Sequence, residues 1–143
     1  MRSKILNGLD LKREYKSVTG KLALLNRELA ENMISLAEQT GETRPLIQAL
    51  NALHSARQTF TIESTPRENA EIQQLMANTL LKIGRQTDDV RCLEHAIKAY
   101  RGAITLASML GDDTMRRELK RDYSLARNLI GQRGSNQSLL GVA

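Results

Sequence analysis

The chain has 143 residues and a formal net charge of +5, with 41% hydrophobic and 26% charged residues. This balance is typical of one globular domain and excludes a disordered or fibrous chain. Aromatic residues make up only 3% and no Trp is present, so we expect a core of Leu, Ile, Ala and Met, which favour helices.

Three features of the sequence bear on where the protein works. No apolar run approaches the roughly 18 residues that a membrane span needs. Residues 1–16 hold no apolar block long enough for a secretory signal. The single cysteine, Cys92, cannot form an internal disulfide, which fits a reducing compartment. We therefore expect a cytoplasmic protein without a membrane span.

Apolar residues recur every three or four positions along most of the chain, which is the spacing of amphipathic helices. We predict five helices, over residues 10–39, 44–62, 66–84, 90–110 and 113–130. In the first of them the periodic apolar positions are Leu22, Leu25, Leu29, Met33 and Leu36. No segment shows the strict alternation of apolar and polar residues that is typical of a β-strand. The predicted fold class is therefore all-α.

Capping residues mark the predicted helix starts. The segment "STPRE" before the third helix has the pattern of a capping box, with Thr65 as N-cap and Glu68 three residues later. The other caps are Thr43, Asp88 or Asp89, and Asp112 or Asp113.

The chain contains an internal repeat. The stretches "LAEQTGETRPLIQALNALHSA" (36–56) and "IGRQTDDVRCLEHAIKAYRGA" (83–103) align without a gap at a spacing of 47 residues, and seven of their 21 aligned positions are identical. Small residues recur on one face of the second helix of each unit, where they let a neighbouring helix approach closely: Ala49, Ala52, Ala56, Ala96, Ala99 and Ala103. Such a face is buried only when units stack, so we predict a helical repeat protein.

The predicted domain organisation follows from this period. The repeat domain covers residues 22–131, divided into units 22–64 and 65–111 and a half unit 112–131. A basic, partly helical segment, 1–21, precedes it. The last residues, 132–143, are rich in Gly, Ser, Asn and Gln, and we expect a flexible tail there.

These residues resemble the tetratricopeptide repeat, a family of helix hairpins that stack into a right-handed superhelix with a concave groove. The likeness rests on the small residues Ala30 and Ala77 in the first helices and on the Ala96-x3-Tyr100 pattern in a second helix. The period of 47 exceeds the family's usual value of about 34. In this respect the chain is more similar to long-period bacterial variants of the repeat. Gln73 stands where the family has a large aromatic residue. The resemblance implies a non-catalytic protein–protein interaction module or scaffold.

In such stacks the first helix of each hairpin lines the concave groove. When the small first-helix residue of the family is aligned with Ala77, the resemblance places the groove positions at ten residues: Arg27, Glu31, Ile34, Glu71, Gln74, Asn78, Leu81, Lys82, Arg121 and Asn128. Mixed polar and apolar side chains suit an extended peptide or a partner helix. Arg27, Lys82 and Arg121 would favour an acidic segment. The same positions are also compatible with an ordinary solvated helix surface.

Two other functions remain open. The final predicted helix is half of a unit whose apolar face another chain could cover, so a helical homo-oligomer with a structural or assembly role, such as a homodimer, is the first alternative. Residues 1–21 and 114–133 each carry six basic and two acidic groups, which makes anion or nucleic-acid binding the second. We do not expect nucleic acid to be the partner, because single-strand binding uses aromatic platforms and the chain has only three Tyr and one Phe.

The sequence contains no recognisable catalytic motif. Cys92 and His95 could offer two metal ligands on one helical face, but a zinc site needs three or four. Phosphate loops, dinucleotide fingerprints and nucleophile elbows are absent. Gly84 and Gly131 follow predicted helix ends, where left-handed C-caps account for them. We therefore predict no enzymatic activity, no cofactor and no metal.

Overall fold

The computed structural model describes residues 8–60 and 65–142, and side chains are described up to residue 132. Five helices and no strand make up this part of the chain. They are α1 (Gly8–Thr40), α2 (Arg44–Thr59), α3 (Pro66–Thr87), α4 (Val90–Leu110) and α5 (Asp113–Val142). The predicted all-α fold of five helices is confirmed. Residues 1–7 of the predicted N-terminal segment lie outside the described residues.

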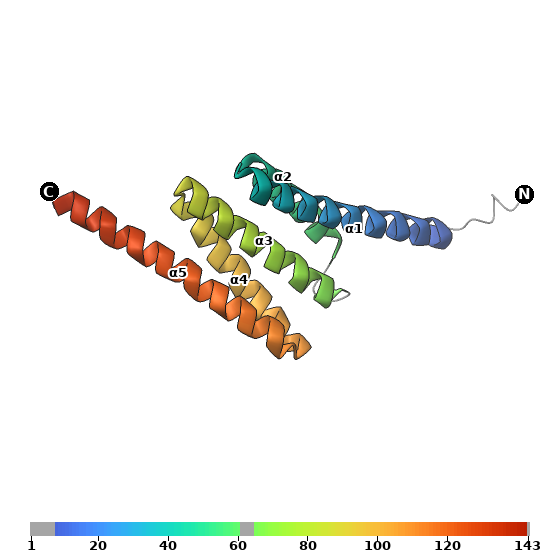
Figure 1. Cartoon of the computed structure of the whole chain (residues 1–143). Helices are drawn as coiled ribbons and strands as arrows, with labels where there is room; N and C mark the ends of the chain where they lie inside the picture. Colours follow the sequence, from blue (N-terminus) through green and yellow to red (C-terminus); the bar gives the residue numbers. More distant parts are fainter. Residues whose placement is uncertain (1–7, 61–64, 143) are drawn as a thin grey trace, which may run out of the picture.

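The helices form two hairpins and a single last helix. α1 pairs with α2, α3 pairs with α4, and α5 lies along α4 (Figure 1). Two ion pairs join the first helices of the hairpins: Arg27 to Glu71 at 2.6 Å and Lys82 to Glu38 at 2.7 Å. Both pairs connect residues 44 positions apart, so α1 and α3 run parallel in the stack.

Alanine faces bring the helices together. Ala49 and Ala56 on α2, and Ala96 and Ala103 on α4, are completely buried. The α4 alanines share a core cluster with Leu119 and other apolar residues of α3 and α5. Because an alanine side chain ends at Cβ, it lets the facing helix backbone come close. Four of the six repeated alanines are therefore part of the packing surface of the stack, as predicted, whereas Ala52 and Ala99 are only partly buried.

The apolar stripe that indicated the first helix is not the buried face of α1. Leu22, Leu25 and Leu29 are each about half exposed. The buried stripe instead consists of alanines at a spacing of seven residues: Ala23, Ala30 and Ala37. Both stripes have helical periodicity, and the larger side chains dominate the hydrophobic signal in the sequence. The close approach of α2, however, requires the small side chains of the alanine stripe.

Two of the predicted helix caps are present and two are not. Asp89 accepts a hydrogen bond from the backbone N of Arg91 at 2.9 Å, and Asp112 accepts one from that of Met115 at 3.0 Å. Thr65 makes no capping hydrogen bond, so the predicted capping box is wrong. Thr43 makes none either, because its hydroxyl donates to Oε1 of Gln86 in the next hairpin at 2.9 Å.

The predicted glycine C-caps are wrong. α3 continues past Gly84, and Asp88 adopts the left-handed conformation at its end, with φ at +59°. Gly84 instead packs against α4, where a Cβ would lie 2.7 Å from a methyl carbon of Leu93. α5 continues past Gly131, so the helix end predicted at Ile130 comes too early. The flexibility of residues 132–143 stays a prediction.

Candidate functional site

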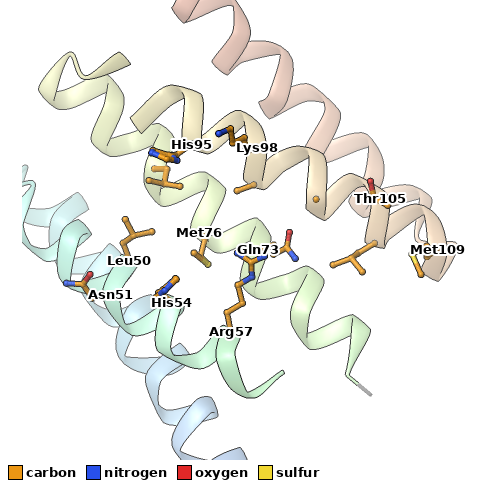
Figure 2. A pocket seen from close by; sticks show the side chains of 14 residues that line it. Leu50, Asn51, His54, Arg57, Gln73, Met76, His95, Lys98, Thr105 and Met109 are labelled. Atoms are coloured by element: carbon orange, nitrogen blue, oxygen red, sulfur yellow. The ribbon is translucent and has the colours of Figure 1, made fainter. Parts of the chain in front are cut away.

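A cavity of about 710 Å³ lies between the two hairpins and is the candidate binding site. Its walls are the second helices, α2 and α4, and α3 forms the floor between them (Figure 2). We call it the α2–α4 cavity. Its residues include Leu50, Asn51, His54 and Arg57 on α2, Gln73, Met76 and Leu80 on α3, and His95, Lys98, Ala99, Gly102, Thr105, Leu106 and Met109 on α4.

Helical spacing brings these side chains to one place. On α2, Leu50, His54 and Arg57 follow one another at four and three residues, so they project from the same face. On α4, the residues that face the cavity include two small ones, Ala99 and Gly102. Small side chains on a wall leave space that larger ones would fill. The cavity thus owes its volume partly to the composition of α4.

The floor is held by a chain of buried amides. Gln73 donates from Nε2 to Oδ1 of Asn69 at 2.5 Å, and Asn69 donates from Nδ2 to the carbonyl of Phe60 at 2.6 Å. A Cβ at position 102 would collide with the Oε1 of Gln73, so the glycine leaves room for this amide. Buried amides with hydrogen-bond partners hold a fixed orientation. The wall between Gln73 and Gly102 is therefore preorganised.

The rim of the cavity is basic on both sides. His54 and Arg57 stand on the α2 wall, and His95 and Lys98 stand on the α4 wall (Figure 2). All four side chains are exposed. No described residue that lines the cavity carries a carboxylate, and none of the four cationic or histidine side chains forms an ion pair with the described part of the chain. The opening therefore favours negative charge.

None of the ten groove residues predicted from the sequence lines this cavity. On α3, Glu71, Asn78 and Lys82 project to the side away from Met76 and Leu80, because consecutive helical residues are about 100° apart. The remaining predicted residues lie on α1, on α5 and elsewhere on α3. The cavity and the predicted groove are thus on different faces of the stack.

Three of the predicted groove residues hold helices together. Arg27 contacts Glu71 across the hairpins and also Glu31, one turn along α1 at 3.4 Å. Burial acts to lower the pKa of Arg27, but the hydrogen bond and charge of Glu71 outweigh it, and the pKa lies above its ordinary value. The hydrogen bond from Lys82 lowers the pKa of Glu38.

Other predicted groove positions differ in their surroundings. Asn78 accepts a hydrogen bond from the hydroxyl of Tyr100 at 2.6 Å. Leu81 is buried in the core, Ile34 and Gln74 are half-buried, and Asn128 is exposed. Arg121 is exposed and contacts its neighbour Asp122 at 3.3 Å. Of this set, Asn128 and Arg121 are the most accessible to a ligand.

None of the residues that line the α2–α4 cavity was predicted from the sequence to bind a partner. His54 and His95 do not align with each other in the repeat, and Lys98 stands on a second helix, whereas the resemblance directs attention to first helices. One signal was present, because Gly102 interrupts a helix that otherwise favours larger residues. A glycine inside a helix often marks close packing or function.

Cys92 lies beside Asp89 at the start of α4. The thiol of Cys92 donates to Oδ2 of Asp89 at 3.7 Å. Burial raises the pKa of Cys92, and the nearby charge of Asp89 adds to the effect, which works against a reactive thiolate. Over residues 8–60 and 65–142, no group of three or more His, Cys, Asp or Glu side chains is placed to hold a metal ion.

Comparisons with known proteins add no relatives. Searches against protein-family models, curated proteins and solved structures found no match to this chain. In the part of the chain that the structure describes, no helix is both long and apolar enough to cross a membrane.

Proposed function

We propose that the protein is a non-catalytic, tetratricopeptide-like module that binds an acidic amphipathic segment of another protein in the α2–α4 cavity. The observation that carries this proposal is an apolar floor between two basic walls. Met76 and Leu80 supply the floor, while Arg57 and Lys98 stand on opposite rims. The single cysteine favours a cytoplasmic setting.

Apolar side chains of the partner would occupy the floor. A volume of about 710 Å³ is within the range of about 300–1,000 Å³ that is typical of ligand sites. Met76 and Met109 are unbranched and polarisable, so they adapt to anchors of different shapes. Leu, Ile or Phe side chains at helical spacing would fit between α2 and α4, in the manner of a helix in a groove.

Acidic side chains of the partner would face the rim. Arg57 and Lys98, with no described carboxylate among the lining residues, create a local excess of positive charge around an apolar floor. Such charge speeds association and selects against basic segments more than it adds affinity. We therefore expect a partner segment with Asp or Glu between its apolar anchors, and binding that weakens as salt concentration rises.

A peptide-binding experiment tests the site. The probe is a labelled helical peptide with Leu at positions i, i+3, i+4 and i+7 and Glu at the exposed positions, compared with the same peptide carrying Lys. We expect the Glu peptide to bind and Arg57→Glu with Lys98→Glu to weaken it by at least about tenfold, or about 1.4 kcal/mol. Fluorescence anisotropy measures the dissociation constant.

Matched controls locate the binding surface. Arg117→Glu changes an exposed cation on α5 that does not line the cavity, and should leave binding unchanged. Arg121→Glu changes the predicted groove instead. Loss of binding with Arg121→Glu, but not with the Arg57 and Lys98 changes, would place the ligand in that groove. Equal binding of the Glu and Lys peptides would remove the electrostatic basis of the cavity as the site.

A further inference from the structure

α1 carries a second apolar stripe, which faces solvent. Its members are between 42% and 71% exposed on one helix face, and their spacing alternates between four and three residues: Leu11, Tyr15, Val18, Leu22, Leu25, Leu29 and, after Asn32, Leu36. This spacing is the heptad pattern of coiled coils, in which the a and d positions face a partner helix. We call these eight positions, Asn32 included, the heptad seam.

The heptad seam is separate from the packing of α1 within the chain. At about 100° per residue, its centre lies about 110° around the helix from the buried stripe of Ala23, Ala30 and Ala37. Arg27 and Glu38, which contact α3, lie still further from it. Both α2 and α3 therefore leave the seam open to a second helix.

The length of α1 also exceeds what the stack covers. α1 has 33 residues and α2 has 16, and the N-terminal half of α1 extends beyond the hairpin (Figure 1). Tyr15 and Val18 in this extension are largely exposed. Helices shorter than about 15 residues are marginal in water without packing. A partner along the seam would supply the packing that this half of α1 lacks.

We propose that two copies of this chain associate through the heptad seams of their α1 helices, as an antiparallel two-stranded coiled coil. In one antiparallel register every seam position meets another. Leu22 of each copy then packs against Leu25 of the other at the centre, and Val18 against Leu29 on either side. Leu11 meets Leu36 at the ends.

The polar seam residue supports this register. Asn32 of one copy lies opposite Tyr15 of the other, so the single amide of the seam meets the single residue with a hydroxyl. Tyr and Asn can donate and accept hydrogen bonds to each other. Polar residues at core positions of coiled coils select register and orientation in this way.

Charges beside the seam favour the same arrangement. Lys21 and Glu28 occupy flanking positions of successive heptads and are both exposed. In the full-overlap antiparallel register, Lys21 of each copy lies beside Glu28 of the other, which gives two attractive pairs. A shift of one heptad brings Lys21 against Lys21, or Glu28 against Glu28. A parallel pairing places Lys21 beside Asn26, without attraction.

The dimer leaves the candidate binding site free. The α2–α4 cavity is lined by α2, α3 and α4, with no described residue from α1. Each dimer therefore presents two cavities, which would strengthen binding to a partner that carries two suitable segments. Dimerisation itself does not depend on the proposed function of the cavity.

Light scattering coupled to size exclusion tests association in the full chain. We expect the wild type to be a dimer and Leu22→Glu to be a monomer with unchanged helicity by circular dichroism. Leu24→Glu is the matched control, because Leu24 is as exposed as Leu22, at 54%, but lies outside the seam. A wild-type monomer at every accessible concentration, or equal effects of the two changes, would overturn the dimer.

A charge-pair design tests orientation. Leu22→Glu combined with Leu25→Lys places the new carboxylate of one copy opposite the new ammonium of the other only if the helices are antiparallel. We expect the double variant to recover dimerisation that Leu22→Glu alone abolishes. If the helices were parallel, like charges would face each other and the double variant would stay monomeric, which would overturn the antiparallel arrangement.

A vesicle-binding experiment tests whether a lipid membrane, instead of a second copy of the chain, covers the heptad seam. The seam begins beside Lys12, Arg13 and Lys16, so a membrane surface is the competing partner. We expect no seam-dependent sedimentation with phosphatidylserine vesicles. A monomer whose vesicle binding is lost in Leu22→Glu but kept in Leu24→Glu would show that lipid, not a second copy, covers the seam.

Discussion

The Nζ of Lys82 on α3 lies 2.7 Å from the Oε1 of Glu38 on α1, although 44 residues separate the two. Arg27 and Glu71 meet with the same separation nearer the start of the two helices. The contact spacing of 44 is shorter than the sequence repeat of 47, because residues that face each other across two helices are not the equivalent residues of the two units. These pairs align the first helices of successive hairpins.

Reversing one charge of this contact should loosen the stack. Lys82→Glu brings two carboxylates together, so we expect a lower urea midpoint, and the change should be smaller in high salt. Glu38→Lys with Lys82→Glu restores opposite charges and should recover most of the midpoint. A double variant no more stable than Lys82→Glu alone would mean that the ion pair does not contribute to hairpin alignment.

Gly84 should not tolerate even a methyl group. In Gly84→Ala the Cβ would lie 2.7 Å and 2.8 Å from two side-chain carbons of Leu93, so we expect a net destabilisation of about 1–3 kcal/mol from overpacking. Gly131→Ala is the matched control, because no atom lies within 4 Å of its Cβ position. It should stabilise α5 by about 0.5–1 kcal/mol through helix propensity. Urea unfolding measures both, and equal signs for the two changes would contradict the packing explanation.

Tyr100 should make the fold sensitive to alkaline pH. Burial raises the pKa of its phenol above the ordinary value of 10.0, with a smaller contribution from the charge of Asp122. The stabilising neutral form is fully present below pH 10, and its contribution is lost as pH rises above that value. We expect the free energy of unfolding to fall progressively as pH rises above 10.

Tyr100→Phe separates this titration from the hydrogen bond. The variant loses the bond to Asn78, so at neutral pH we expect a cost of about 0.5–1.5 kcal/mol. Its unfolding free energy should then decline less above pH 10 than that of the wild type. An equally steep decline would show that another group causes the alkaline loss.

Asp112 should make the fold sensitive to acidic pH. The backbone hydrogen bond from Met115, followed by the hydrogen bond from Arg67, lowers the pKa of Asp112 below its ordinary value of 3.8. The stability that its ionised form contributes is present above that value and is lost as pH falls through the lowered pKa. Asp112→Asn keeps an acceptor for the cap but should flatten the acid dependence of the urea midpoint.

Much of the fold could be predicted from the sequence, because its determinants are local. Helical periodicity and the aspartate caps depend on residues a few positions apart, so four helix starts agree with the structure and the first differs by two residues. The alanine faces were predictable because the repeat showed them twice, and an alanine has little reason to recur on one face except close packing. The number of helices and the packing surface of the second helices were therefore accessible.

Only the tertiary structure decided which surfaces are covered and which stay open. α1 has two stripes with helical spacing, and the position of α2 on the alanine stripe leaves the leucines exposed. Arg27 and Lys82 were predicted to line a groove, and the structure shows in addition that each forms an ion pair with a neighbouring helix. The α2–α4 cavity likewise combines residues of three helices. Periodicity reports the faces of a single helix, whereas burial depends on which residues distant in sequence come to lie against each face.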